Sequence, residues 1–415
     1  MTKEQNKDQL PKDWRWVKLG EVCDVIMGQS PPSTTYNTDG IGLPFFQGKS
    51  EFTDLYPIVK KWCNTPNKIA EPNDILLSVR APVGTTNIAN QICCIGRGLA
   101  AIRHENYKYV FYFLRYRQQE LDSKGTGTTF RAISGETIRE TLFPNPPKPT
   151  QLAIVSKIEE LFSELDKGIE NLRTAQQQLK TYRQSVLKWA FEGKLTNENV
   201  KDGELPKGWK LTKLGEYIED ISSGKSYRCD ERPPKKDEVG IVKVSSVTWG
   251  FFDEMESKTC FSKDFFNTKY LIKKGDFLFS RANTIEFIGA CVIVNKIDKS
   301  LMLSDKILRF TFLKDISKEY ALYYLRSRKG RKQIETLSTG NQDSMRNIGQ
   351  EKIRQIEFPY CSIKEQNNIV QEIENRLSVT DKMDESITQS LQQAEALRQS
   401  ILKKAFEGRL IKVLG

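Results

Sequence analysis

The residue types in this sequence that could do chemistry do not form a complete catalytic or metal-binding motif. Gly48-Lys49-Ser50 ends like a phosphate-binding loop, but the first glycine of that motif would have to stand at Leu43. The chain has one histidine, His104, and eight scattered cysteines without a CxxC pair, so a structural zinc site is not expected. No carboxylate cluster fits a nuclease. The sequence therefore predicts a binding protein rather than an enzyme.

The segment Asn145-Pro146-Pro147 resembles the start of the catalytic tetrapeptide of amino-methyltransferases. That tetrapeptide needs an aromatic residue next, where this chain has Lys148, and no glycine-rich cofactor turn precedes it. We interpret the segment as the beginning of a helix. We expect no cofactor to be bound by this chain.

A heptad pattern occupies residues 150–193. Apolar or small residues recur every seven positions, which is typical of a coiled-coil helix about 65 Å long at 1.5 Å per residue. We expect Thr150 to cap its start and Gly193 to end it in a left-handed turn. The two seam series are Ile154, Leu161, Gly168, Ala175, Tyr182 and Trp189, and Ile158, Leu165, Leu172, Leu179 and Val186.

This helix has a copy in the same chain. Residues 359–410 align without a gap on residues 144–195, with 22 identities in 52 positions. The densest identity joins 183–193 (RQSVLKWAFEG) to 398–408 (RQSILKKAFEG), and Ser362 with Glu365 has the spacing of a capping box. The second seam is less regular: it uses Ile369, Ile373, Met383, Ile387, Ala394, Leu397 and Ile401, but includes Arg376 and Thr380.

The repeat extends beyond the helices. LPKDWRWVKLGEV (10–22) returns as LPKGWKLTKLGEY (205–217), so each half has an opening motif, a globular part and a closing helix. Short strand-like runs occur at 42–48, 73–82 and 93–103, and again at 240–250, 275–283, 290–296 and 307–313. Helical stretches follow near 107–121 and 319–337, and the polar segment 196–206 reads as a linker.

These patterns predict an α+β fold with two pseudo-symmetric mixed α/β domains and a long antiparallel coiled coil of two helices. The alternative is that each helix packs on its own domain or on another chain. We expect a first domain at 1–147, a first helical region at 148–195, a linker and second domain at 196–361, and a second helical region at 362–415.

The composition indicates a polyanionic partner. The net charge is +11 and the pI about 9.1, which favours nucleic acid, although a merely soluble basic protein has the same balance. No apolar run reaches transmembrane length and residues 1–9 lack a signal-peptide core, so we expect a cytoplasmic protein.

Taken together, these features resemble the specificity subunit of Type I restriction–modification systems. The resemblance covers nearly the whole chain and is carried by the two opening motifs, the loop GTGTTFR (125–131), the segment FPNPPKPTQLAIVSKIEELF, its copy FPYCSIKEQNNIVQEIENRL and the two AFEG ends. It implies two target recognition domains that each read one half of a bipartite, asymmetric double-stranded DNA site, and conserved helices that act as a ruler.

The resemblance also implies partners. Two methyltransferase subunits would bring S-adenosylmethionine and methylate an adenine in each half-site, and restriction (translocase) subunits would bring ATP. We expect Phe191 and Phe406, at the repeated helix ends, to take part in docking the methyltransferases; the alternative is that they only close the coil's own core.

We predict DNA contacts from polar and basic residues on expected loops, because arginine pairs with guanine edges and Asn or Gln with adenine. About half of them would be solvated or would contact phosphate. The candidates are Gln29, Ser30, Lys49, Arg80, Thr128, Thr129 and Arg131 in the first domain, and Lys225, Ser226, Arg228, Lys243, Arg281, Asn283, Gln342 and Arg346 in the second. Arg80 and Arg281 are favoured because both follow equivalent strands that begin at an aspartate.

Two other functions fit the same sequence. One is the specificity subunit of a Type II-like restriction–modification enzyme, and the other is a non-catalytic coiled-coil scaffold that binds proteins. The sequence does not specify the DNA target or its spacer.

Overall fold

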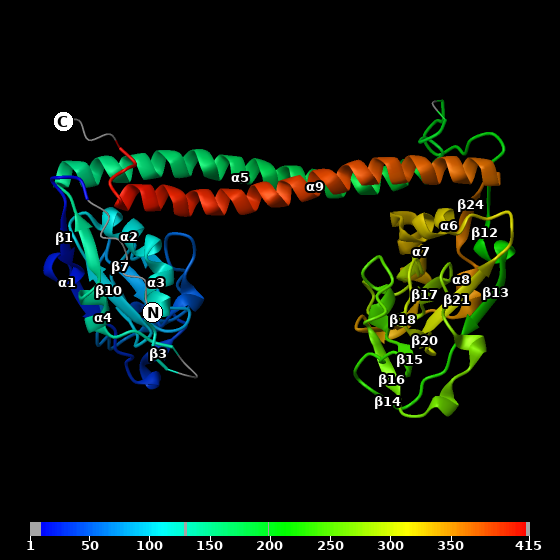
Figure 1. Ribbon diagram of the computed structural model, residues 1–415, viewed down its shortest axis with the longest axis horizontal. Helices are drawn as coiled ribbons and strands as arrows, with labels where there is room; N and C mark the ends of the chain where they lie inside the picture. The colour runs from blue at the N-terminus through cyan, green and yellow to red at the C-terminus, as the bar shows by residue number, and fades with distance from the viewer. Residues whose placement is uncertain (1–9, 128–130, 198, 412–415) are drawn as a thin grey trace. The chain divides into compact units, whose positions relative to one another are not determined.

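The computed structural model describes residues 10–127, 131–197 and 199–411 (Figure 1). It divides into two compact units, one made of Met1–Arg173 and Thr388–Gly415 and the other of Thr174–Ile387. Each unit contains one β-rich domain and one part of a pair of long helices, α5 (Lys148–Phe191) and α9 (Ile363–Phe406). The predicted α+β class, with two β-rich domains and two long helices packed together, is confirmed.

The helices α5 and α9 run antiparallel within each unit. In the first unit, Asp166 of α5 forms an ion pair with Arg398 of α9. In the second unit, Gln176 donates a hydrogen bond to Asp384 at 3.0 Å, and Arg183 forms an ion pair with Asp381. Residues later in α5 thus meet residues earlier in α9, as expected for an antiparallel pair.

The burial of the seam differs from the predicted heptads in the middle of α5 and at its end. Ile154 and Ile158 are buried, but Gly168 and Trp189, which belong to the same series as Ile154, are exposed. In the last two turns the buried side chains are Val186, Leu187, Ala190 and Phe191. The pattern changes there because the helix end packs into the core of a β-rich domain.

The predicted helix ends are partly correct. Gly193 has the expected left-handed backbone, with φ at 76°. The prediction for Thr150 was wrong, because α5 begins at Lys148 and Thr150 lies inside its first turn. At the predicted capping box before α9, the Ser362 hydroxyl accepts a hydrogen bond from the backbone N–H of Glu365 at 3.3 Å. The Glu365 carboxylate accepts one from the Thr196 hydroxyl at 2.6 Å.

The first domain contains a four-stranded antiparallel sheet in the order β2-β10-β7-β8, next to a five-stranded sheet in the order β3-β5-β4-β9-β6. The strands are β2 (Asp24–Met27), β3 (Tyr36–Asn37), β4 (Leu43–Phe46), β5 (Trp62–Cys63), β6 (Ile69–Ala70), β7 (Ile75–Ser78), β8 (Thr86–Ile88), β9 (Cys93–Ile95) and β10 (Leu99–Arg103). β1 (Arg15–Lys18) pairs with β11 (Leu142–Asn145), and the helices are α1 (Leu19–Val22), α2 (Tyr107–Tyr116), α3 (Gln118–Ser123) and α4 (Gly135–Arg139).

The second domain repeats this plan. Its antiparallel sheet has the order β13-β21-β17-β19, and a second sheet has the order β14-β16-β15-β20. The strands are β13 (Ile218–Ser223), β14 (Cys229–Asp230), β15 (Val239–Val242), β16 (Ser257–Cys260), β17 (Phe277–Ser280), β19 (Cys291–Ile293), β20 (Ser300–Met302) and β21 (Ile307–Phe312). β12 (Lys210–Lys213) pairs with β24 (Glu357–Tyr360), and β18 (Ala282–Asn283), β23 (Met345–Asn347) and β22 (Thr339–Gln342) form a small third sheet. The helices are α6 (Lys318–Arg326), α7 (Arg328–Leu337) and α8 (Gln350–Arg354).

Each domain core is completed by the end of the helix from the other repeat. Phe406 of α9 is buried in the first unit, 5.2 Å from the Tyr109 ring and 5.5 Å from the Phe113 ring. Phe191 of α5 is buried in the second unit, with its ring 5.2 Å from that of Tyr320. Both domains therefore use the same aromatic packing against equivalent helices, α2 and α6.

Candidate DNA interface

The predicted DNA contacts of the second domain gather at one end of its main sheet. β13 ends at Ser223 and β17 ends at Ser280, whereas β21 begins at Ile307. Because these strands are antiparallel neighbours, their loops meet at that end. The loops carry Lys225, Ser226, Arg228, Arg281 and Asn283 from the predicted set, together with Asp305 and Lys306, which the sequence reasoning missed.

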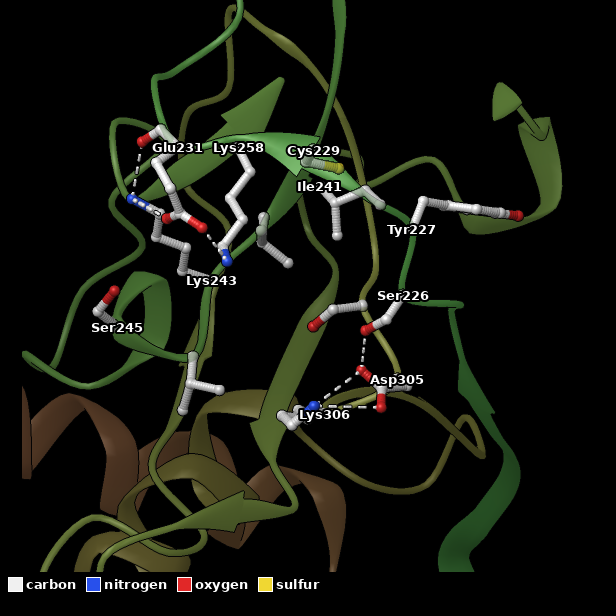
Figure 2. A pocket seen from close by; sticks show the side chains of 13 residues that line it. Ser226, Tyr227, Cys229, Glu231, Ile241, Lys243, Ser245, Lys258, Asp305 and Lys306 are labelled. Carbon is white, nitrogen blue, oxygen red and sulfur yellow. Dashed lines mark hydrogen bonds and ion pairs between the residues drawn. The ribbon is translucent and has the colours of Figure 1, made fainter. Parts of the chain in front are cut away.

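A hollow of about 410 Å³ opens beside these loops (Figure 2). On one side, the Ser226 hydroxyl donates a hydrogen bond to Asp305, and the Lys306 ammonium lies 3.3 Å from the same carboxylate. Partial burial disfavours the ionised carboxylate, but the bonds from Ser226 and Lys306 outweigh it, so the pKa of Asp305 is lower than usual. The acid is therefore ionised at neutral pH and holds both side chains in place.

On the other side of the hollow, the Glu231 carboxylate holds two amines (Figure 2). Lys258 Nζ lies 2.6 Å from it and Lys243 Nζ 3.6 Å. The hydrogen bond from Lys258 is the main cause that lowers the pKa of Glu231. Three lysines and two carboxylates therefore surround the opening, which leaves an excess of positive charge suited to a phosphate.

The hairpin β22–β23 lies against β18 at the same end of the domain. Gln342 and Asn341 are exposed on it. The Arg346 guanidinium instead bonds the hairpin's own backbone, donating to the carbonyl of Gly340 at 2.9 Å and that of Ser338 at 2.8 Å. Arg346 thus holds the hairpin, and its role as a base-reading residue stays a prediction.

The first domain has the same arrangement at the end of the sheet β2-β10-β7-β8. Gln29 and Ser30 follow β2 as Lys225 and Ser226 follow β13. Ser30 Oγ accepts the backbone N–H of Arg97 at 3.1 Å, where the equivalent hydroxyl of Ser226 bonds Asp305. The residue before each pair is a glycine. A Cβ atom on Gly28 would collide with the carbonyl oxygen of Gly96, and a Cβ atom on Gly224 would collide with that of Leu303. Both loops need glycine for this close approach.

The remaining candidates of the first domain lie near this sheet end. Lys49 follows the Gln47–Gly48 turn, whose backbone abuts Gly98 just before β10. Arg80 is exposed after β7 and pairs through its backbone with Ala132, next to Arg131. Thr128 and Thr129 lie outside the described residues. Arg97, which is exposed, was missed because its turn reads in the sequence as part of one long strand.

Arg80 and Arg281 follow the equivalent strands β7 and β17, as expected, but their positions differ by one residue. In the first domain, the Val79 N–H donates to the Gly98 carbonyl and the Val79 carbonyl accepts from the Ile133 N–H. In the second domain, Arg281 makes the same two bonds, with the Lys306 carbonyl and the Ile348 N–H. Arg281 therefore corresponds to Val79. Because successive side chains of an extended chain point to opposite faces, the side chains of Arg80 and Arg281 point to opposite faces of their equivalent segments.

The candidate docking residues Phe191 and Phe406 are each 2% exposed and contact the aromatic rings of the domains. Each fills the core of a β-rich domain rather than a core of the coil alone, and the docking role of both stays a prediction. In the described ranges, no helix is long and apolar enough to cross a membrane, and no group of three or more His, Cys, Asp or Glu side chains could hold a metal ion.

Comparison with known families decides what kind of protein this is. The Type I restriction modification DNA specificity domain matches residues 11–174 and 206–396, which includes both β-rich domains. The chain belongs to this family. It is a DNA specificity subunit of a Type I restriction–modification system, part of a complex that acts on DNA. Members of the family are non-catalytic, and partner subunits bind the cofactors of the complex.

Several relatives support this assignment. The chain is 39% identical over 193 residues to the MjaX specificity subunit of Methanocaldococcus jannaschii, an alignment that covers 45% of this chain and 44% of that protein. It is 24% identical over 428 residues to the Type I restriction enzyme EcoKI specificity subunit of Escherichia coli K12, covering 97% of this chain and 90% of that one. The chain thus spans less than half of MjaX but most of EcoKI.

A solved structure shows the same fold. The HsdS subunit from Thermoanaerobacter tengcongensis superposes with a TM-score of 0.57 and 20% sequence identity, covering 98% of this chain and all of that chain.

Proposed function

We propose that this specificity subunit reads a bipartite, asymmetric DNA site, with one half-site for each β-rich domain. The observation that supports this is the duplicated sheet end, where one backbone frame carries different side chains. Gln29 stands where the second domain has Lys225, and Arg97 stands where it has Asp305. Equivalent frames can approach DNA in the same way, and different donors and acceptors select different bases.

The proposed recognition domains are residues 1–147 and 196–361, the latter including the linker, and the helical regions are 148–195 and 362–415. Base reading is assigned to exposed side chains at the sheet ends, and phosphate contacts to the amines around the hollow. The first group includes Gln29, Arg80, Arg131, Lys225, Arg228 and Gln342, and the second consists of Lys243, Lys258 and Lys306. In the first domain, Lys49 is also proposed as a phosphate contact.

The complex that we propose contains two methyltransferase subunits, one docked at each end of the helix pair. The support is a set of exposed residues, outside the buried cores, that the duplication keeps identical. Gln184 and Lys188 near the end of α5 correspond to Gln399 and Lys403 near the end of α9, and all four are exposed. Beside α2 and α3, Gln399 and Lys403 line a groove of about 500 Å³.

The methyltransferase subunits would supply S-adenosylmethionine and methylate one adenine in each half-site. Restriction and translocase subunits that use ATP would complete the complex. Because its target is cellular DNA, we place the protein in the cytoplasm.

A domain exchange tests the reading of two half-sites. Residues 22–143 are replaced by the corresponding part of another family member, and methylated sites are mapped by sequencing DNA from cells that express the chimera with its methyltransferase. The expected result is one changed half-site and one unchanged half-site. A change in both half-sites would contradict the proposal. The matched control exchanges the second domain and should change the other half-site.

A further inference from the structure

The hairpin β22–β23 of the second domain exposes an apolar side chain among polar residues. Met345 is 77% exposed, which is the largest value among the large hydrophobic side chains in the described ranges. An isolated exposed hydrophobic residue is common on protein surfaces. Met345 differs because it lies on a hairpin that several contacts hold in one conformation, next to residues that we propose to contact DNA.

Several contacts fix the hairpin in one conformation. Gln342 pairs with Met345 across the two-residue turn Asp343–Ser344, and the Asp343 carbonyl accepts the Ile285 N–H at 2.7 Å. Arg346 bonds the carbonyls of Gly340 and Ser338, as described above. Gly340 has φ at 144°, and a Cβ atom there would collide with the Met345 carbonyl. The Met345 side chain is therefore presented from a rigid support, which reduces the entropy lost on binding.

The shape and chemistry of the hairpin fit the major groove of DNA, which admits a two-stranded β-ribbon. Asn341 and Gln342, both exposed, carry amides that can pair with adenine edges. Asp343 at the turn is also exposed, and its carboxylate repels phosphate but can accept from the cytosine amino group. This combination suits base edges better than the DNA backbone.

We propose that β22–β23 enters the major groove of the half-site read by the second domain, and that Met345 packs against the 5-methyl group of a thymine there. The contact makes Met345 a specificity-determining residue, and it rests on the proposed DNA recognition. The first domain has Phe130 before Arg131 where the second has Met345 before Arg346, so the sequence keeps an apolar residue at this position in both domains. Phe130 itself lies outside the described residues.

The test uses the complex of the full chain with its methyltransferase subunits and a duplex that carries its mapped site. Each thymine of the second half-site is replaced in turn by deoxyuridine, which removes only the methyl group, and the Kd is measured by fluorescence anisotropy. One replacement should weaken binding of the natural chain about three- to tenfold, the scale of one buried methyl group. Met345→Ala should bind the thymine duplex similarly weakly and should show no further loss with deoxyuridine at that position.

Met255→Ala is the matched control, because Met255 is also exposed in this domain but lies outside the hairpin. This variant should keep the full sensitivity to deoxyuridine. The proposal is overturned if Met345→Ala keeps that sensitivity, if no thymine methyl affects the natural chain, or if Met345→Ala loses methyltransferase subunits instead of DNA affinity. A natural complex that does not prefer its bipartite site to random duplex would contradict the proposed function itself, so the two failures are distinguishable.

Discussion

Arg183 Nη2 lies 2.6 Å from Asp381 Oδ1, and this ion pair joins α5 to α9 in the second unit. The duplication places Arg398 and Asp166 in the same relationship in the first unit. The shared spacing means that both units use one helix register. The side chain of Asp381 is 63% exposed, so solvent screens much of the attraction.

A double-mutant cycle with Arg183→Ala and Asp381→Ala should therefore give a small coupling energy, about 0.2 to 1 kcal/mol in chemical denaturation. The coupling should shrink at high salt. A coupling above about 2 kcal/mol, or one that is insensitive to salt, would contradict the view that apolar packing and not this pair stabilises the helices.

Truncation of the two phenylalanines should destabilise different domains. Phe406→Ala removes a buried ring from the core of the first domain, and Phe191→Ala does the same in the second, at a cost of about 3–5 kcal/mol each. Hydrogen exchange measured by mass spectrometry should accelerate in α2 for Phe406→Ala and in α6 for Phe191→Ala. Each variant is the control for the other, and loss of protection in the same domain for both would contradict the packing described here.

Charge reversal at the exposed helix ends should affect subunit docking without unfolding either domain. Lys403→Glu and Lys188→Glu should each weaken one of the two methyltransferase contacts, because each changes one copy of the repeated surface. Native mass spectrometry should show a rise in complexes with one methyltransferase subunit. The free energy of unfolding of each variant should stay within about 0.5 kcal/mol of that of the natural chain. Full occupancy in both variants would place docking elsewhere.

Neutralisation of Asp305 should alter DNA binding through Lys306. Asp305→Asn removes the carboxylate that partly neutralises this lysine, so the phosphate contact assigned to Lys306 should strengthen and the slope of log K against log salt should steepen by up to about 0.9. The lowered pKa of Asp305 means that its stabilising effect is complete above its ordinary pKa and is lost only as the pH falls through the still lower value in the folded protein. Between pH 6 and 8, affinity should therefore not change through this acid, and titration in that range would contradict the assignment.

Lengthening of α5 tests whether the helix pair sets the spacer. Four residues inserted between Gln177 and Leu179 add about one turn, roughly 6 Å, and create a stutter that a coiled coil absorbs by local unwinding. This length corresponds to at most about two base pairs at 3.4 Å each, and DNA twisting should reduce the shift to about one. Sequencing of methylated sites should show a longer spacer between unchanged half-sites. An unchanged spacer with full methylation would exclude the helices as the ruler.

The sequence alone was sufficient to predict the elements whose signals are local. The heptads and the Gly193 terminus defined α5 within a few residues, because helix periodicity and capping depend on near neighbours. The copy in 359–410 predicted the second long helix, and the apolar runs located β4, β7, β10 and β17. The gathering of Gln29, Ser30 and Arg80 on loops could be predicted because glycine and proline mark the turns.

Only the tertiary structure decided what the same side chains do. Phe191 and Phe406 look like partner contacts in the repeat, but each fills an aromatic core formed by residues far away in the sequence. The Arg346 guanidinium bonds backbone carbonyls of its own hairpin, while its role in reading bases stays a prediction. Arg281 matches Val79 rather than Arg80 in backbone pairing. The packing of Phe191 and Phe406 and the match of Arg281 with Val79 depend on which distant segments meet and in what register, and the Arg346 contacts depend on how its hairpin folds. Local periodicity carries no information about any of these.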